Sequence, residues 1–229
     1  MNHTQTDIAE HFDEVSADYD FWKNKNWYYY DELKRIAKEY SVVDKKILDV
    51  GCGTGTILSE LPLKRGTGID ISQKMIDVAR ERYHDRQDLS FAAADITNFV
   101  PQEKFDTVLC FDVVEHIVDH RLLLQSLAHC INPDGKIVLS MANPLWEPIL
   151  MLAEKLKMKM PEGPHHRISA KMLMKLANDV GLELLKKEER LLVPKYIPFI
   201  SGFFNDYFGH LPFFKNLNFI EVFIFSLKS

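Results

Sequence analysis

The fold of this chain is decided by the stretch Ile47-Leu48-Asp49-Val50-Gly51-Cys52-Gly53-Thr54-Gly55. It reads as a hydrophobic strand that ends at an acid and continues into a loop with glycine at three alternate positions. Glycine lets the backbone turn sharply into a helix and lets a ligand approach the main chain closely. A dinucleotide fingerprint would have its third glycine at position 56, which is threonine here, so the loop departs from the NAD-binding pattern.

Two further acids follow the next candidate strands. Asp70 comes about 20 residues after the first glycine, where an acid accepts hydrogen bonds from ribose hydroxyls. Asp95, in Ala94-Asp95-Ile96, is placed to accept a hydrogen bond from an adenine amino group. Each acid alone is explained equally well as a helix cap or turn former. Together with the displaced glycine, however, they favour an adenosine ligand, and S-adenosylmethionine (SAM) over NAD.

Short apolar runs alternate with amphipathic stretches from Lys46 onward, which predicts βα units and a parallel sheet. Ser72 is the expected N-cap of one helix, Pro62 should end another, and Asn132-Pro133-Asp134-Gly135 predicts a turn before the fifth strand. The predicted strands are 47–50, 68–71, 90–94, 107–111 and 136–141, and the predicted helices are 56–61, 72–83 and 120–131.

The alternation pauses over residues 142–169 and then resumes. A helix is expected near 170–180, stopped by Gly181, followed by strands at 182–193 and 219–227. Between these strands, residues 194–215 are rich in proline and aromatic residues, and nine of the fifteen phenylalanines lie at or beyond Phe199. We interpret this segment as an aromatic cap, and residues 1–45 as helical.

Composition excludes several classes of protein. The 229 residues carry a net charge of -5 with a pI near 6.0, which argues against a nucleic-acid partner. Three scattered cysteines, Cys52, Cys110 and Cys130, indicate a reducing compartment and small core residues. The N-terminal residues show no secretory signal and no apolar run has the length of a membrane span, so we expect a cytoplasmic protein; surface contact with a membrane stays open.

These features together resemble the class I SAM-dependent methyltransferases, in particular the small-molecule branch that includes ubiquinone- and menaquinone-pathway enzymes. The resemblance covers about residues 12–185. Its motifs are the glycine loop, Val15-Ser16-Ala17-Asp18-Tyr19-Asp20, Gly68-Ile69-Asp70, Ala94-Asp95, Phe105-Asp106-Thr107-Val108, Val114-Glu115-His116-Ile117 and Asn132-Pro133-Asp134-Gly135.

The resemblance implies an α/β fold with a Rossmann-like sheet of strand order 3-2-1-4-5-7-6, strand 7 antiparallel, and helices on both faces. It also implies that Gly51 and Gly53 wrap the methionine part of SAM, that Asp70 holds the ribose and that Asp95 with Ile96 frames the adenine. Backbone groups at Cys110 and Phe111 would lie near the ammonium. The expected cofactor residues are Tyr19, Asp49, Gly51, Cys52, Gly53, Asp70, Ile71, Met75, Ala94, Asp95, Ile96 and Phe111.

We therefore expect one domain over residues 1–229. Its parts are a helical lid (1–45), a SAM-binding core (46–141), acceptor-side insertions (142–215) and a final strand (216–229).

The end of the fourth strand departs from two related enzyme classes. Phe111-Asp112-Val113-Val114 lacks the Asn/Asp-Pro-Pro-Tyr/Phe tetrad that holds a planar amino nitrogen, which disfavours a DNA amino-methyltransferase. No Pro-Cys pair follows, so the covalent cysteine route to a pyrimidine carbon lacks its nucleophile.

Methyl transfer from a sulfonium is an in-line displacement that needs a base only where the acceptor carries a proton. His116 is the first candidate base because it follows the fourth strand, and His165 and His166 are the second candidates. Each could equally orient a loop or lie in a solvated turn. Asp112, Glu115 and His116 have a spacing that could gather a divalent cation, but hard cations want more oxygen ligands, so a metal is not favoured.

The flanking segments predict the acceptor side. In the lid, Tyr19 is expected nearest the cofactor and Trp27 to Tyr30 nearer the acceptor, although an aromatic stripe also suits simple packing. Residues 145–152, followed by Lys155, Lys157 and Lys159, have the apolar face and basic residues of an interfacial helix. With the aromatic cap they indicate an apolar or lipid-like acceptor; peripheral membrane contact and a homodimer interface explain them as well.

The sequence thus predicts a SAM-dependent methyltransferase, releasing S-adenosylhomocysteine, that acts on a small apolar acceptor, with oxygen the favoured receiving atom. N- or C-methylation of a small metabolite is the enzymatic alternative. A non-catalytic SAM-binding partner subunit is the alternative from another class. A dehydrogenase is disfavoured by the displaced glycine.

Overall fold

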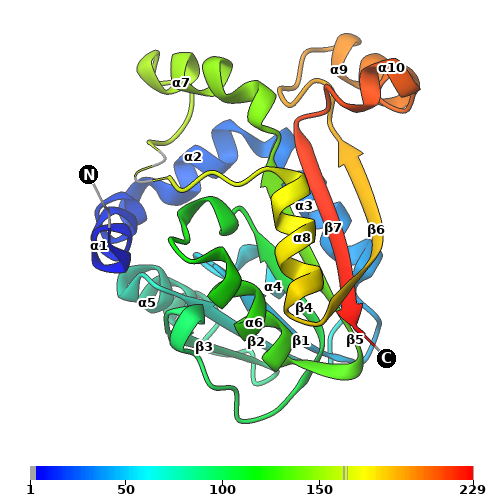
Figure 1. The fold of residues 1–229 in the computed structure, drawn as a ribbon. Helices are drawn as coiled ribbons and strands as arrows, with labels where there is room; N and C mark the ends of the chain where they lie inside the picture. Colours follow the sequence, from blue (N-terminus) through cyan, green and yellow to red (C-terminus); the bar gives the residue numbers. More distant parts are fainter. Residues whose placement is uncertain (1–3, 162, 164, 229) are drawn as a thin grey trace.

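A single seven-stranded sheet forms the centre of the computed structural model, which describes residues 4–161, 163 and 165–228 (Figure 1). The strand order is β3-β2-β1-β4-β5-β7-β6, and β7 runs antiparallel to both of its neighbours while the other pairs are parallel. The order and the antiparallel strand implied by the family resemblance are confirmed. The strands are β1 (Lys46–Val50), β2 (Arg65–Asp70), β3 (Leu89–Ala93), β4 (Phe105–Phe111), β5 (Ile131–Ala142), β6 (Leu182–Arg190) and β7 (Ile220–Leu227).

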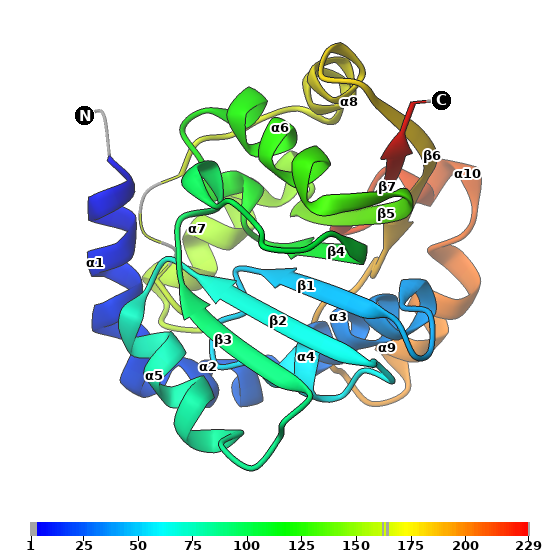
Figure 2. The same ribbon diagram turned by 90° about the horizontal axis from the view of Figure 1, so that it is seen from below.

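Helices cover both faces of the sheet (Figure 2). One face carries α6 (His120–Cys130) and α8 (Ala170–Asp179), and the other carries α3 (Trp27–Tyr40), α4 (Thr56–Ser59) and α5 (Gln73–Arg82). The remaining elements are α1 (Gln5–Val15), η1 (Ser16–Asp18), α2 (Tyr19–Lys25), η2 (Ile96–Asn98), η3 (Val114–His116), η4 (Pro144–Trp146), α7 (Glu147–Lys155), α9 (Ile200–Phe203), the π-helical turn η5 (Phe204–Phe208) and α10 (Pro212–Lys215).

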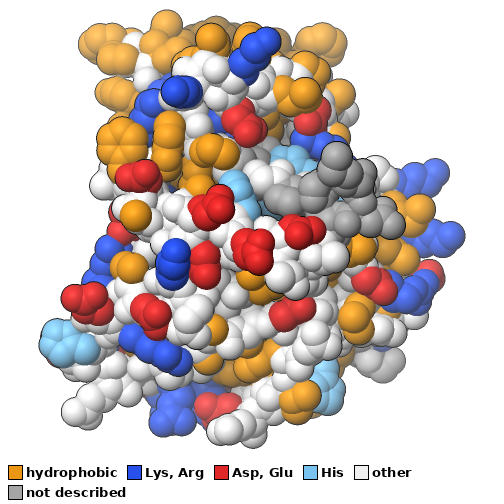
Figure 3. Space-filling view, turned by 90° about the vertical axis from the view of Figure 1, so that its left-hand side faces the viewer, with side chains coloured by type: hydrophobic (Ala, Val, Ile, Leu, Met, Phe, Trp, Pro, Cys, Tyr) orange, Lys and Arg blue, Asp and Glu red, His pale blue; other side chains and the backbone are white. Residues whose placement is uncertain are grey.

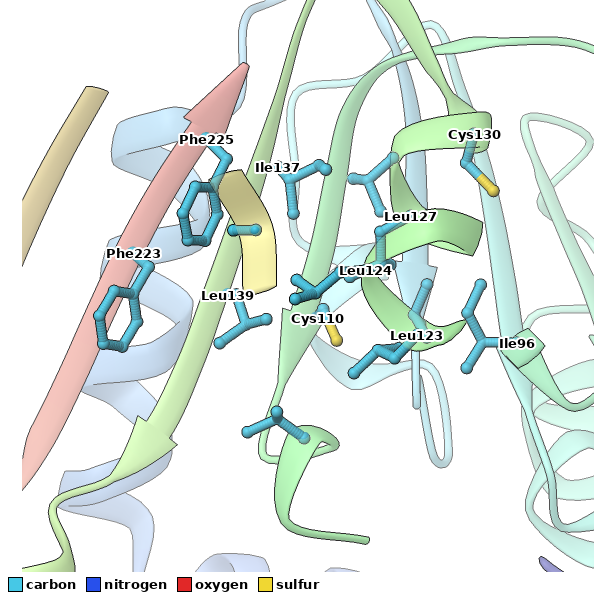
Figure 4. Packing of buried hydrophobic residues seen from close by; sticks show 14 of the residues in the cluster. Ile96, Cys110, Leu123, Leu124, Leu127, Cys130, Ile137, Leu139, Phe223 and Phe225 are labelled. Carbon is cyan, nitrogen blue, oxygen red and sulfur yellow. The ribbon is translucent and has the colours of Figure 1, made fainter. Parts of the chain in front are cut away.

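Alternating side chains of each strand build two separate cores. Cys110 of β4 packs with Leu124 and Leu139 on the α6 side of the sheet, as Figure 4 shows, whereas Leu109 and Phe111 pack on the opposite face. Because both faces are covered, β4 is apolar almost throughout. All three cysteines are buried and free, as predicted.

The fifth strand begins earlier than predicted. Ile131 pairs with Phe105 and Lys136 pairs with Thr107, so the four residues 132–135 lie opposite Asp106 alone. The expected turn is therefore a wide irregularity inside β5, where the Asn132 side-chain amide donates to Asp106 Oδ1 at 2.9 Å. Pro133 and Gly135 indicate an interruption of the strand pairing, but they do not show whether strand residues lie before the interruption as well as after it.

Other boundaries follow local chemistry closely. The Ser72 hydroxyl accepts from the Met75 amide and caps α5, and Gly181 follows α8 with a φ of +86°, as expected. The first predicted helix, 56–61, is shorter than expected, since α4 ends at Ser59. No helix in the described part of the chain is long and apolar enough to cross a membrane.

Candidate active site

A cavity of about 550 Å³ lies at the carboxyl ends of β1, β2 and β4. Its volume falls in the range of roughly 300–1,000 Å³ that small-molecule sites occupy. The lid helices α1 to α3, the glycine loop and the segment that contains α7 all contribute to its wall. The switch in strand order between β1 and β4 is where open α/β sheets bind their ligands.

The cavity collects all twelve residues of the expected cofactor set, whereas Cys110, which was also expected near the ammonium, does not line it. Residues at the ends of three strands, in the glycine loop and in the lid come together although they are far apart in the chain. They are Tyr19, Asp49, Gly51, Cys52, Gly53, Asp70, Ile71, Met75, Ala94, Asp95, Ile96 and Phe111.

The glycine loop is shaped by positive φ angles and by Asp70. Gly51 and Gly53 have φ of +72° and +53°, a region that favours glycine, and a Cβ on Gly51 would lie 2.3 Å from Val113 Cγ2. The Gly53 amide donates to Asp70 Oδ2 at 2.8 Å, and the Ser72 amide donates to Asp70 Oδ1 at 2.9 Å. Asp70 therefore ties the loop to the start of α5, and each of its oxygens keeps one further acceptor position.

A lysine that sequence reasoning missed faces the same acids. Lys23 of α2 lines the cavity, and its Nζ lies 4.6 Å from the Tyr19 ring centroid and 5.2 Å from that of Tyr30. Burial lowers the pKa of Lys23, while Asp49 and Asp20 act in the opposite direction. Burial raises the pKa of Asp49 to about 7, with Lys23 lowering it and Asp70 raising it. No motif marked this lysine.

A second acidic pair lies on the other side of the cavity. Asp112, with a φ of +54°, accepts from the Tyr29 hydroxyl at 2.7 Å and from Ser140 Oγ at 3.2 Å. Glu115 Oε1 accepts from the Ala142 amide at 2.7 Å, whereas its buried Oε2 has no hydrogen-bond partner among the described residues. Burial raises the pKa of Glu115 to about 7, and the charge of Asp112 acts in the same direction. Glu115 is thus held by one oxygen and presents the other.

The three predicted histidines are placed differently from one another. His116 and His165 line the cavity with ring centroids 5.4 Å apart, and Phe12 packs edge-on against His116 at 5.2 Å. His166 does not line it; its amide donates to the Glu115 carbonyl at 2.6 Å and its own carbonyl accepts from His120. The position of His166 therefore lends no support to a catalytic role.

The remaining cavity wall is largely apolar, and it corrects one expectation. None of the phenylalanines between Phe199 and Phe214 reaches the cavity, so the predicted aromatic cap does not form the acceptor pocket; only Pro194 and Lys195 of that segment line it. These rings lie on the short helices α9, η5 and α10 and pack against one another, with Phe208 in contact with both Phe203 and Phe214. The apolar wall away from the glycine loop includes Trp22, Trp146, Ile149, Leu150, Met158, Met160, Pro194 and Phe219.

The predicted trio Asp112, Glu115 and His116 is not arranged as a set of metal ligands. Within the described ranges no group of three or more His, Cys, Asp or Glu side chains is placed to hold a metal ion. Both Asp112 oxygens accept from Tyr29, so the first acid of the predicted trio Asp112, Glu115 and His116 is already engaged. Glu162 and Pro164, in the loop before His165, lie outside the described residues.

Comparison with known proteins identifies the family. A family model described as a methyltransferase domain matches residues 21–187, more than half of the chain. The chain belongs to this methyltransferase family. The ubiquinone biosynthesis O-methyltransferase of Coxiella burnetii (strain Dugway 5J108-111) is 32% identical over 164 residues, covering 67% of this chain and 70% of that protein. The enzyme of the same name from Actinobacillus pleuropneumoniae serotype 7 (strain AP76) is 33% identical over 141 residues, covering 56% and 60%.

Solved structures agree on the fold of the methyltransferase. One chain of the complex between the Haloferax volcanii Trm112 methyltransferase activator and a methyltransferase aligns with a TM-score of 0.70 and 20% identity, covering 95% of this chain and 98% of that chain. Magnesium protoporphyrin IX methyltransferase from Synechocystis PCC 6803, with bound S-adenosylhomocysteine, aligns with a TM-score of 0.63 and 16% identity, covering 98% and 99%. The protein is a SAM-dependent methyltransferase, as the sequence predicted.

Proposed function

We propose that this methyltransferase transfers the methyl group of SAM to a hydroxyl oxygen of a small apolar acceptor of the phenol or quinol type. The observation that carries the proposal is the presence, in one cavity, of an apolar wall and of a buried carboxylate oxygen, Glu115 Oε2, that has no hydrogen-bond partner among the described residues. The relatives named ubiquinone biosynthesis O-methyltransferase support an acceptor of this chemistry.

The residues around the glycine loop suit SAM. Gly51 and Gly53 have no side chain, so a ligand in the cavity can approach their backbone closely, and the methionine part would lie there. The free acceptor positions of Asp70 suit ribose hydroxyls. Lys23 offers a cation for the carboxylate of SAM, and Asp49 an anion for its ammonium.

SAM affinity is expected to rise with pH through the ionisation of Asp49. With a raised pKa of about 7, Asp49 is mostly neutral below that pH and mostly ionised above it, and only the ionised form attracts an ammonium. Titration calorimetry should show roughly tenfold tighter SAM binding at about pH 8 than at about pH 6, because the fraction of protein in which Asp49 is ionised grows by about that ratio.

The matched variant for this pH test is Asp49→Asn. It should bind SAM more weakly at the higher pH and show little pH dependence. An unchanged pH dependence in the variant would assign the titration to another group and remove Asp49 from the ammonium site.

Bound SAM supplies an electrophilic methyl carbon on a sulfonium, so the protein has to align the acceptor oxygen, exclude water and take up a proton. The apolar wall excludes water from the acceptor side. Ionised Glu115 accepts the hydroxyl proton through Oε2 while the Ala142 amide holds Oε1 in place. The hydrogen bond from Tyr29 to Asp112 joins the lid to the end of β4. Closure of the lid therefore also fixes Asp112 beside the acceptor.

Matched acceptors test the proposal. The values of kcat/KM should be compared for a catechol with an alkyl tail, the same catechol without the tail, and the corresponding aniline. We expect the tailed catechol to exceed the tail-free one by about tenfold or more, since each buried methylene contributes roughly 0.8 kcal/mol. Methylated nitrogen formed faster than methylated oxygen would overturn the choice of receiving atom.

A further inference from the structure

One end of the molecule carries more exposed apolar side chains than a water-facing surface requires. They belong to residues 145–158 and 196–217, and we call them the apolar end. Figure 3 shows hydrophobic side chains gathered along the top of the molecule, the end at which α7, α9 and α10 lie in Figure 1. Phe199 is 97% exposed, Phe213 79% and Met151 64%. Contiguous exposed apolar surface marks an interaction site.

The backbone actively presents Phe199 to solvent. Its φ of +65° is unfavourable for a bulky side chain, yet the turn is fixed by a buried serine. Ser201 Oγ accepts from the Ile197 amide and donates to the Lys195 carbonyl, both at 2.6 Å. An aromatic residue held outward at a conformational cost has no role in the core.

Helix α7 is apolar on both of its sides. Ile149, Leu150 and Ala153 line the cavity, while Met151 and Leu152 point outward with 64% and 57% of their surface exposed. No residue of this helix is buried. Only residues 149–153 of the helix are apolar throughout, and their outer side chains need an apolar environment beyond the cavity. Helix α7 is therefore a thin wall between the acceptor cavity and the outside.

Charge at the apolar end has the sign that an anionic surface attracts. Within the apolar end Lys155, Lys157 and Lys215 are exposed and Asp206 is the one exposed acid, while Glu147 and Glu154 are partly buried. The whole chain, by contrast, has 28 Lys and Arg against 33 Asp and Glu. Lys25 Nζ donates to the Lys157 carbonyl, and Lys195 Nζ donates to the Lys25 carbonyl, which joins α7, the lid and the C-terminal segment. The exposed Lys155 and Lys157 follow the apolar face of α7 directly.

We propose that the apolar end docks onto the surface of an anionic lipid bilayer, with the rings of residues 199–213 and the outer face of α7 entering the headgroup region and the lysines contacting lipid phosphates. Docking places α7 between the bilayer and the cavity, so an acceptor dissolved in the bilayer reaches the active site without crossing water. The docking itself is argued from the surface alone, whereas the route of the acceptor rests on the proposed function.

Vesicle flotation tests the docking in the absence of SAM or acceptor. Wild-type protein should float with vesicles of equal parts phosphatidylcholine and phosphatidylglycerol. The F199S/F213S variant should bind them at least about tenfold more weakly, as expected for two lost ring insertions. The matched control is V100S, since Val100 is 76% exposed in the loop before β4 and outside the apolar end. The K155Q/K157Q variant should lose roughly 30-fold in affinity for these vesicles, at about 1 kcal/mol per lysine, and none for phosphatidylcholine alone.

Several results would overturn the docking proposal. Wild type that does not float, or F199S/F213S that floats like wild type, contradicts it. A dimer in sedimentation velocity that F199S/F213S dissociates would assign the apolar end to a second copy of the chain. SAM titration of the same variants keeps the outcomes separate: binding at wild-type affinity shows that the variants are folded, and a failure of methyl transfer would concern the active site and leave the docking result standing.

Discussion

Replacing Glu115 with glutamine is expected to lower kcat by about 10²- to 10⁴-fold, the usual contribution of a positioned general base. Glutamine keeps the size of the side chain and can still accept a hydrogen bond from the Ala142 amide. It cannot, however, take up the hydroxyl proton of the acceptor. Because the pKa of Glu115 is raised to about 7, the wild-type kcat/KM for the acceptor, measured at saturating SAM so that Asp49 does not contribute, should rise as the pH increases through that value and then level off. The variant should lose this ascending limb while it retains SAM binding.

His116→Asn is the comparison that separates the two candidate bases. His116 packs between Phe12 and His165, so its loss should disturb the cavity wall and raise KM more than it lowers kcat. If His116→Asn removed the ascending limb and Glu115→Gln kept it, the histidine would be the base and the assignment of Glu115 would fail.

Replacing Asp70 with alanine is expected to weaken SAM binding by about one to three kcal/mol, or roughly 5- to 150-fold. Two losses combine in this variant: the acceptor positions for the ribose, and the hydrogen bonds that hold the Gly53 and Ser72 amides. Titration calorimetry measures the change, and thermal unfolding reports whether the variant is folded.

Asp85→Ala serves as the control, since Asp85 is an exposed acid in the loop before β3. It should bind SAM like the wild type. A folded Asp70→Ala protein with unchanged SAM affinity would exclude Asp70 from the ribose site.

The cofactor half of the cavity could be predicted because its signals are local. A strand, a glycine loop and an acid at a strand end lie within a few residues of one another, and parallel strands bring their carboxyl ends to one edge of the sheet. The side chains from Asp49 to Phe111 therefore followed from the order of elements. The strand order itself came from the resemblance to a family, since local pattern does not determine which strands pair.

The acceptor half could not be predicted in the same way, because it is made by contacts between distant segments. Tyr29 and Asp112 are 83 residues apart, and the sequence marked Glu115 only by its spacing from a histidine. Lys23 carried no motif. The phenylalanines from Phe199 to Phe214 were expected to cover the acceptor, but their density in the sequence said nothing about the direction in which they point. None of them lines the cavity, and Phe199, Phe203 and Phe213 are more than half exposed.

The most direct test of this account is titration calorimetry of the purified wild-type protein with SAM and, separately, with NADH. The cavity geometry predicts one SAM bound per chain, strengthened as the pH rises through about 7, and no displacement of SAM by NADH. A folded protein that fails to bind SAM, or that exchanges it for NADH, would contradict the assignment of the glycine loop, Asp49 and Asp70 to a SAM site.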